Sequence, residues 1–223
     1  MSRVPLFDIS PVVSPRLGVW PGDSPLSRQV LLDLARGDTV TLSTLRATVH
    51  LGAHADAPSH YGREGAAIHA RDLSFYLGPC QVIHTPVSRG ARVDVGDLQS
   101  AIRAERVLLA TGTFPDPQSW NDDFGGITPS LVDHLAGAGV RLVGIDTPSV
   151  DLIASKDLPA HQAVLRHDMA ILEGLVLGGV PEGIYELIAL PLRLEGFEAS
   201  PVRAILRAMP MDFVTPRAPT SPR

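Results

Sequence analysis

Histidine and aspartate are concentrated in one short segment, "HLGAHADAPSH" at residues 50–60, which holds His50, His54, Asp56 and His60. Imidazole and carboxylate groups are common protein ligands of zinc and other divalent ions. Several such groups converging on one point would lose hydration, and a bound cation would compensate for that loss. The segment therefore predicts a metal site in preference to a set of solvent-facing or hydrogen-bonded histidines.

The spacing favours an extended segment. His50, His54 and Asp56 all stand at even positions, and alternate residues of a strand share one face. A helix would have to hold Gly52 and Pro58 in its interior, at a cost of about 1 and about 3 kcal/mol respectively. We therefore expect a strand that carries the three side chains on one face and then enters a loop.

Single residues elsewhere could complete the site. His60 follows the loop proline and suits proton transfer, or it could be a third ligand. Glu173 stands alone in the apolar run "DMAILEGLVLGG", where a carboxylate either faces solvent, pairs with a base or binds a metal. His161 and His167 in "LPAHQAVLRHD" are equivalent candidates by spacing. Asp146, at the end of a predicted strand, could orient a ligand or only form a turn.

Trp20 lies in the loop "GVWPGDSP", where no helix or strand accounts for it. A tryptophan in such a loop either fills the core or stacks on an aromatic ligand, and stacking contributes roughly 0.5–1.5 kcal/mol beyond the burial of area. The sequence leaves both roles open.

The elements that must position these residues indicate an α/β protein. Helices are predicted at 95–105, with Asp97 as a cap, and at 128–139, with Thr128 as the cap and Pro129 in the first turn. We expect one domain over 1–211 and a flexible proline-rich tail over 212–223. Short apolar runs predict strands; they lie at 6–10, 41–51, 80–87, 106–111, 141–147, 186–192 and 202–209.

Composition excludes several classes of function. The net charge is −5 without a run of Lys or Arg, which argues against nucleic-acid binding. No segment reaches the roughly 18 apolar residues of a membrane span. The single Cys80 and the absence of a secretory signal favour a cytoplasmic location. The nucleophile elbow G-x-S-x-G, H-E-x-x-H, C-x-x-C, the P-loop and G-x-G-x-x-G are all absent.

The segment "HLGAHADAPSH" resembles the H-x-G-T-H-x-D-x-P-x-H signature of the metal-dependent cyclase-like hydrolases, and within that family the whole chain resembles the kynurenine formamidase (arylformamidase) branch. Further matches are "WPGD" at 20–23, "GIDTPSVD" at 144–151, "AHQAVL" at 160–165 and "LEGL" at 172–175. Ala53 departs from the signature, where many members have threonine. That departure weakens the broad cyclase assignment more than the formamidase one.

The resemblance implies a role for each candidate. It makes His50, His54 and Asp56 ligands of one metal ion. It makes Asp56 a bridge to a second ion held by His161 and Glu173. It gives His60 the role of general acid and base, and it places Trp20 against the aromatic ring of the substrate.

The resemblance also implies a swivelling β/β/α fold with a barrel-like mixed sheet, flanking helices and a homodimer. The implied activity is hydrolysis of N-formyl-L-kynurenine to L-kynurenine and formate in tryptophan degradation, by metal-bound hydroxide. Two divalent ions per subunit are implied, with zinc favoured although the ligand types also suit manganese. The alternatives are another aryl or cyclic amide hydrolase of the isatin hydrolase type, and a noncatalytic metal-binding or ligand-sensing protein.

Overall fold

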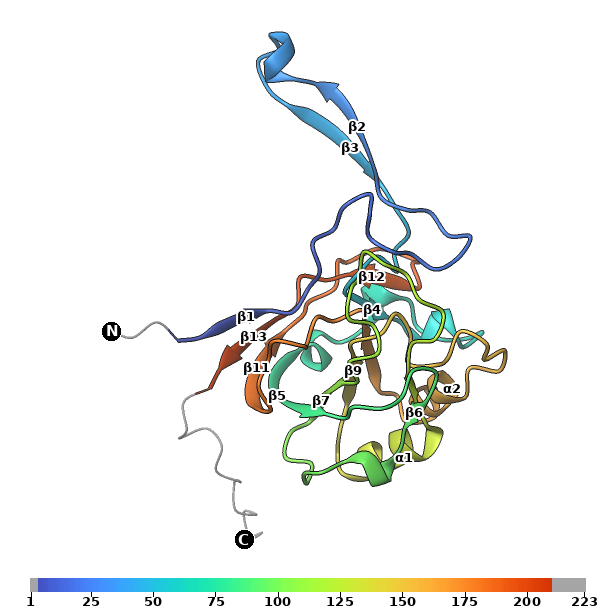
Figure 1. Cartoon of the computed structure of the whole chain (residues 1–223). Helices are drawn as coiled ribbons and strands as arrows, with labels where there is room; N and C mark the ends of the chain where they lie inside the picture. The colour runs from blue at the N-terminus through green and yellow to red at the C-terminus, as the bar shows by residue number, and fades with distance from the viewer. Residues whose placement is uncertain (1–3, 210–223) are drawn as a thin grey trace, which may run out of the picture.

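The computed structural model describes residues 4–209, and Figure 1 shows the arrangement of the elements. The predicted tail at 212–223 lies outside the described residues. A nine-stranded sheet in the order β1-β13-β11-β5-β7-β9-β10-β4-β12 forms the body. Its strands are β1 (Leu6–Asp8), β4 (His54–Asp56), β5 (Leu77–His84), β7 (Arg106–Ala110), β9 (Leu142–Ile145), β10 (Ala170–Glu173), β11 (Gly183–Ile188), β12 (Ala199–Pro201) and β13 (Ile205–Ala208).

The sheet is mixed and curls into a half-barrel (Figure 1). Its centre is parallel, because β5, β7, β9 and β10 run in one direction. The flanking pairs are antiparallel, including β10 with β4 and β4 with β12. The predicted α/β class with a barrel-like mixed sheet is therefore confirmed.

The central strands are buried on both faces, which explains their continuous apolar sequences. Along β7, Val107 and Leu109 point to one hydrophobic cluster, and Leu108 between them points to the other. The cluster that holds Val107 is covered by two helices, α1 (Pro129–Gly137) and α2 (Pro159–Arg166). The other cluster fills the inside of the curled sheet. Two cores on opposite faces thus fix the strands that carry the site.

The helix predictions met different outcomes. α1 is confirmed, and the Thr128 hydroxyl accepts a hydrogen bond from the Leu131 N–H as its cap. The helix predicted at 95–105 is wrong, since only a 3-10 turn at Val95–Asp97 forms there. The buried Gln81 side chain takes over that backbone by donating to Ala101 O and accepting from Arg103 N. A tertiary contact therefore overrides the local helical pattern.

A two-stranded hairpin projects from the body at the top of Figure 1. It consists of β2 (Ser27–Leu32) and β3 (Leu42–Arg46), and a 3-10 turn at Leu34–Arg36 forms part of its tip. The strand predicted at 41–51 is thus correct only in its first half. The remaining elements are short: β6 (Arg92–Val93) pairs with β8 (Gly126–Ile127), and 3-10 turns span Pro58–His60, Ile68–Ala70 and Leu73–Phe75.

Over residues 4–209, neither helix is long enough to cross a membrane, since α1 has nine residues and α2 eight.

Candidate metal centre

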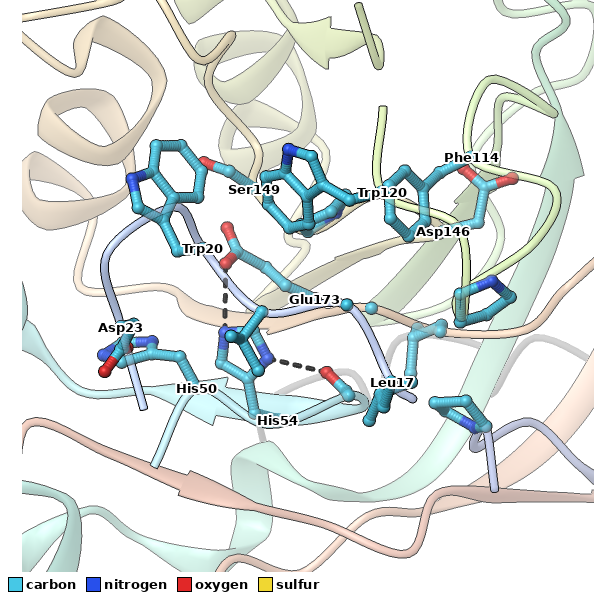
Figure 2. A pocket seen from close by; sticks show the side chains of 18 of the residues that line it. Leu17, Trp20, Asp23, His50, His54, Phe114, Trp120, Asp146, Ser149 and Glu173 are labelled. Carbon is cyan, nitrogen blue, oxygen red and sulfur yellow. Dashed lines mark hydrogen bonds and ion pairs between the residues drawn. The ribbon is translucent and has the colours of Figure 1, made fainter. Parts of the chain in front are cut away.

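Strands β4 and β10 bring three acidic and basic side chains together. His54 and Asp56 alternate along β4 and therefore share one face. In the antiparallel register, Glu173 of β10 stands directly opposite His54. The Nε2 atom of His54 lies 3.2 Å from a carboxylate oxygen of Glu173 (Figure 2). Glu173 is 3% exposed on an inner strand, so the alternative of a solvent-facing edge position does not hold.

His50 reaches the site through a turn, and the strand predicted to run from His50 to Asp56 is wrong in its first half. Gly52 has φ +60°, a left-handed conformation that interrupts the extended backbone. The carbonyl oxygen of Gly52 lies 2.8 Å from Nδ1 of His54. This carbonyl can only accept, so Nδ1 carries a proton, and Nε2 is the nitrogen that faces the site and binds a ligand once its own proton is lost. The same turn therefore redirects His50 and orients His54.

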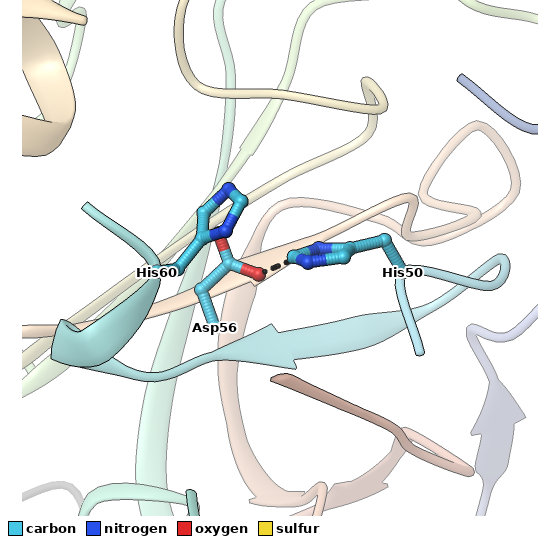
Figure 3. A group of neighbouring side chains, drawn as sticks. All are labelled: His50, Asp56 and His60. Atoms are coloured by element: carbon cyan, nitrogen blue, oxygen red, sulfur yellow. Dashed lines mark ion pairs between the residues drawn. The ribbon is translucent and has the colours of Figure 1, made fainter. Parts of the chain in front are cut away.

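His60 approaches from the 3-10 turn at Pro58–His60, in agreement with the predicted loop position. Figure 3 shows His50 and His60 on either side of Asp56. The Nδ1 atom of His50 lies 3.1 Å from Asp56, and the rings of His50 and His60 are 4.4 Å apart between centroids. Because Asp56 is fully buried while both histidines are partly accessible, the two rings line the solvent side of this carboxylate.

His161 enters from the first turn of α2 and is held by Asp151. Its Nδ1 atom lies 2.9 Å from the Asp151 carboxylate, and its Nε2 atom lies 3.6 Å from both Asp56 and Glu173. Asp151 also accepts the backbone N–H groups of Ala160 and His161 and pairs with Arg92 at 2.7 Å. One buried carboxylate therefore caps the helix and directs Nε2 of His161 toward the site.

Electrostatics in the cluster favour charged groups despite burial. Burial alone would lower the pKa of His54, but the neighbouring carboxylates of Glu173 and Asp56 outweigh it and raise that pKa to about 9. Burial is likewise outweighed at His161, where Asp151 and Asp56 raise the pKa to about 10. Burial opposes ionisation of Asp56, yet contacts with His161 and His50 hold its pKa well below the usual range. His60 behaves oppositely, because burial lowers its pKa more than Asp56 raises it.

The donor set fits divalent metal ions. Across the described part of the chain, Nε2 of His54 and both carboxylate oxygens of Asp56 are buried without a hydrogen-bond partner. Such orphaned atoms are costly unless a cation occupies the space between them. Two groups of ligand atoms, each within 4.8 Å of one another, share Asp56: one is His50, Asp56 and His60, the other His54, Asp56 and Glu173. A shared carboxylate is the arrangement that two ions would need.

An apolar cavity of about 290 Å³ opens above these ligands (Figure 2). Trp20 lines it and is 39% exposed, so the ring is not a core residue. Its ring meets that of Trp120 edge to face, 5.8 Å between centroids, and Phe114 packs against Trp120 at 5.7 Å. The cavity therefore offers several aromatic faces within reach of the histidines.

Asp146 also lines this cavity, but its carboxylate is committed to the protein. It accepts hydrogen bonds from the Thr111 N–H, the Thr111 hydroxyl and the Gly112 N–H. These contacts fix the turn that precedes Phe114. Asp146 thus supports the cavity wall through contacts with a distant turn, which goes beyond the two roles considered from the sequence, a ligand-orienting group or a local turn.

The structure brings together the seven residues to which the resemblance assigns a role: His50, His54, Asp56, His60, His161 and Glu173 form the cluster, and Trp20 stands above it. His167 lies elsewhere and pairs with Asp133 on the surface. Asp151 and Trp120 were missed. Asp151 stands in the quoted "GIDTPSVD" segment, and Trp120 follows "TFPDPQS", a loop with the same Pro-rich character as that of Trp20.

The fold and the ligand cluster together define a metal-dependent hydrolase. Residues 7–152, more than half of the chain, match the Cyclase family model, and the chain belongs to that family. One similar solved structure is a potential metal-dependent hydrolase with cyclase activity, 26% identical over 93% of this chain and 100% of the other, with a TM-score of 0.80. Another is a predicted metal-dependent hydrolase from Bacillus stearothermophilus, 26% identical over 92% and 99%, with a TM-score of 0.78.

Isatin hydrolase A from Ralstonia solanacearum has the same fold. It is 22% identical, with a TM-score of 0.77 over 92% of each chain.

Proposed function

We propose that this protein is an arylformamidase that hydrolyses N-formyl-L-kynurenine to L-kynurenine and formate. The observation that carries the proposal is the aromatic-lined cavity directly above the histidine and carboxylate cluster. An aryl ring would lie among Trp20, Trp120 and Phe114, and the formamide attached to it would point toward Asp56 and the histidines. Such a pocket, mainly apolar with a few convergent polar groups, is typical of small-molecule sites.

Two divalent ions, zinc by preference, would be held by the ligands already described. The resemblance assigns His50, His54 and Asp56 to one ion and Asp56, His161 and Glu173 to the other. The two groups of ligand atoms within 4.8 Å divide the same cluster differently, with His60 beside His50 and His54 beside Glu173. When bound, such ions polarise a carbonyl oxygen and lower the pKa of a bound water to about 7. The hydrogen bond from Nδ1 of His54 to the Gly52 carbonyl, 2.8 Å long, directs Nε2 toward the site, and a metal ion would replace the proton on Nε2.

His60 is proposed to move the protons. Its lowered pKa keeps the imidazole neutral at pH 7, so it can accept a proton from the attacking water. The carbon–nitrogen bond of the formamide then breaks, and the imidazolium returns the proton to the departing aniline nitrogen. The oxygen of the water, now bonded to the formyl carbon, leaves in formate, its second proton is released to solvent, and kynurenine departs with a free amine. A positioned acid and base of this kind contributes typically about 10²–10⁴-fold.

A second candidate is a hydrolase of isatin or a related cyclic aryl amide. It is favoured by the shared fold with isatin hydrolase A and by the fact that both substrates present an amide nitrogen on an aryl ring. The same residues would bind the metal ions and transfer the protons in both reactions, and only the shape of the cavity would determine which substrate is preferred.

The test is the initial rate of kynurenine formation by metal-replete protein, measured beside the rate of isatin hydrolysis. A kcat/KM for N-formyl-L-kynurenine at least about 100-fold above that for isatin, a difference of about 2.7 kcal/mol, supports the formamidase. The reverse order supports the second candidate. No turnover of either compound by protein with bound metal would refute both, and would leave a binding role for the site.

A further inference from the structure

The segment "WPGD" at residues 20–23 forms a tight turn at the cavity. The Asp23 N–H donates to Trp20 O at 2.9 Å, with Pro21 second and Gly22 third in the turn. Gly22 has φ +90°, the left-handed conformation that the third position of a type II turn requires, and proline suits the second position. The turn therefore holds Asp23 and Trp20 at fixed positions relative to each other, and both residues line the cavity.

Three carboxylates line the cavity, and they differ in the groups that already contact them. Glu173 belongs to the ligand cluster, and Asp146 accepts three hydrogen bonds from a neighbouring turn. Asp23 is exposed, and within residues 4–209 only the Ser24 N–H donates to its carboxylate, through Oδ1 at 2.6 Å. Its Oδ2 atom therefore keeps its capacity to accept a hydrogen bond from a ligand.

The same cavity has no side chain suited to an anion outside the metal cluster. Among the described residues that line it, none is a lysine or an arginine. Histidines that bind a metal are neutral, so in the metal-replete protein the positive charge would lie on the ions at the floor of the cavity. The outer part of the cavity thus offers one carboxylate and several aromatic rings, and both kinds of group attract cations.

N-formyl-L-kynurenine carries a cation that suits this arrangement. Its formamide and its amino-acid side chain stand on adjacent carbons of the aryl ring, and the side chain ends in an ammonium and a carboxylate group. Figure 2 shows Asp23 at the end of the cavity where Trp20 and His50 are labelled, with Phe114 at the other end. With the formamide at the histidines, the ammonium group would meet Oδ2 of Asp23, and the carboxylate group would stay in solvent.

We propose that Asp23 binds the α-ammonium group of the substrate and makes the site selective for aryl formamides with a cationic side chain. This inference rests on the proposed function and names a residue for the part of the substrate that the aromatic rings leave unrecognised. It also separates the two candidate substrates, because isatin has no ammonium group. Asp23 acts on substrate binding and not on the chemical step, since the ammonium group is remote from the bond that breaks.

The first test compares metal-replete wild type and Asp23→Asn on two formamides. One is N-formyl-L-kynurenine, and the other is 4-(2-formamidophenyl)-4-oxobutanoate, which keeps the carboxylate but lacks the ammonium group. Asparagine keeps the size of the side chain and a carbonyl that can accept the Ser24 N–H. KM for N-formyl-L-kynurenine should rise about fivefold with kcat unchanged, because an exposed charge pair contributes at most about 1 kcal/mol. KM for the second compound should stay the same or fall.

The matched control is Asp116→Asn. Asp116 is also exposed in a proline-rich loop, and its carboxylate accepts the Gln118 N–H at 3.0 Å, but it does not line the cavity. It should leave both KM values unchanged. An equal rise of both KM values in Asp23→Asn would show that Asp23 only supports the turn, and it would overturn the proposal.

The second test measures binding without turnover. The chain has two tryptophans, Trp20 and Trp120, and both line the cavity, so tryptophan fluorescence reports its occupancy. The metal-replete protein is titrated with L-kynurenine and with 2-aminoacetophenone, which has the same aniline and ketone without the amino-acid group. The Kd of L-kynurenine should rise about fivefold in Asp23→Asn, and the Kd of 2-aminoacetophenone should not change.

The two tests distinguish a failure of this inference from a failure of the proposed function. Protein that does not hydrolyse N-formyl-L-kynurenine, but binds L-kynurenine more weakly in Asp23→Asn, would refute the proposed function and keep the ammonium site. Rapid hydrolysis with the same KM in wild type and Asp23→Asn would refute the ammonium site alone. Equal Kd values of L-kynurenine for the two proteins, or no saturable quenching by it, would also overturn the ammonium site.

Discussion

Asp151→Asn removes the negative charge that orients His161 while leaving the size of the side chain unchanged. Asp151 is fully buried and accepts from His161, from two backbone N–H groups and from Arg92. An asparagine NH₂ must face either Arg92 or the donors at the start of α2. Each arrangement sets donor against donor, and the one with the NH₂ toward α2 also favours the imidazole tautomer with its proton on Nε2, the atom that faces Asp56 and Glu173.

The substitution should have two separate effects, one on the stability of the protein and one on its affinity for metal. Leaving a buried donor without an acceptor costs about 1–3 kcal/mol, and breaking a buried ion pair about 3–5 kcal/mol. Arg92 keeps its bonds to Ile127 O and Ser155 Oγ, and its side chain is 20% exposed. The cost should therefore fall at the low end of the ion-pair range, and we expect the free energy of unfolding to decrease by about 3 kcal/mol. For a domain of this size that lowers Tm by about 6–12 °C. Loss of a residue that orients a metal ligand further weakens metal affinity by about 10–100-fold.

The assay separates these effects. Urea unfolding of the metal-free protein reports the free energy of unfolding, and competition with a chromogenic chelator, under conditions where both proteins are folded, reports zinc affinity. The matched control is Asp133→Asn, because Asp133 also contacts an arginine and a histidine, at 3.2 and 2.7 Å, but is 50% exposed. It should cost less than about 1 kcal/mol and leave zinc affinity unchanged. Wild-type zinc affinity in Asp151→Asn would refute the orienting role.

Further outcomes can be stated for other parts of the site. His60→Ala should lower kcat by about 10²–10⁴-fold with both metal ions retained; metal loss on equilibrium dialysis would make His60 a ligand instead. Gly174→Ala should lower the free energy of unfolding by more than about 2 kcal/mol, because Gly174 has φ +64° and an added Cβ would lie 2.2 Å from Gly52 O. Gly178 has open space around it, so Gly178→Ala should leave the urea unfolding curve nearly unchanged. Trp120→Leu should raise KM for aryl formamides more than it lowers kcat, and an unchanged KM would remove Trp120 from the aryl pocket. In the metal-free protein, the raised pKa values of His54 and His161 contribute stability that is fully present below about pH 6.5 and is lost as pH rises through about 9 and 10. Metal must displace these protons, so zinc affinity should rise with pH, and a pH-independent affinity would show that neither histidine is protonated before binding.

Local pattern was sufficient for several parts of the site. The alternation of His54 and Asp56 gave their common face, and the position of Pro58 gave the loop approach of His60. The capping residue Thr128 and the proline after it gave α1. These features depend on neighbours within a few residues, so the information lies in the sequence itself.

Local pattern failed where a distant group satisfies the backbone. The helix predicted at 95–105 gives way to contacts with the Gln81 side chain. The first N–H groups of α2 are accepted by Asp151, eight residues before the helix begins, so no residue next to Pro159 signals its start. In both cases the partner of a backbone group is chosen by tertiary packing.

The sequence by itself determined the ligand types, the candidate residues and the α/β class, because residue chemistry and short-range periodicity are written in the order of amino acids. Only the tertiary structure decided that Gly52 turns the chain between His50 and His54, and that Glu173 stands opposite His54 in the β4–β10 register. It also decided that Asp151 rather than a neighbour fixes His161, and that the β2–β3 hairpin projects from the body with every strand residue exposed. These features depend on which distant segments pack together, and strand register and burial are set by the whole core rather than by any one segment.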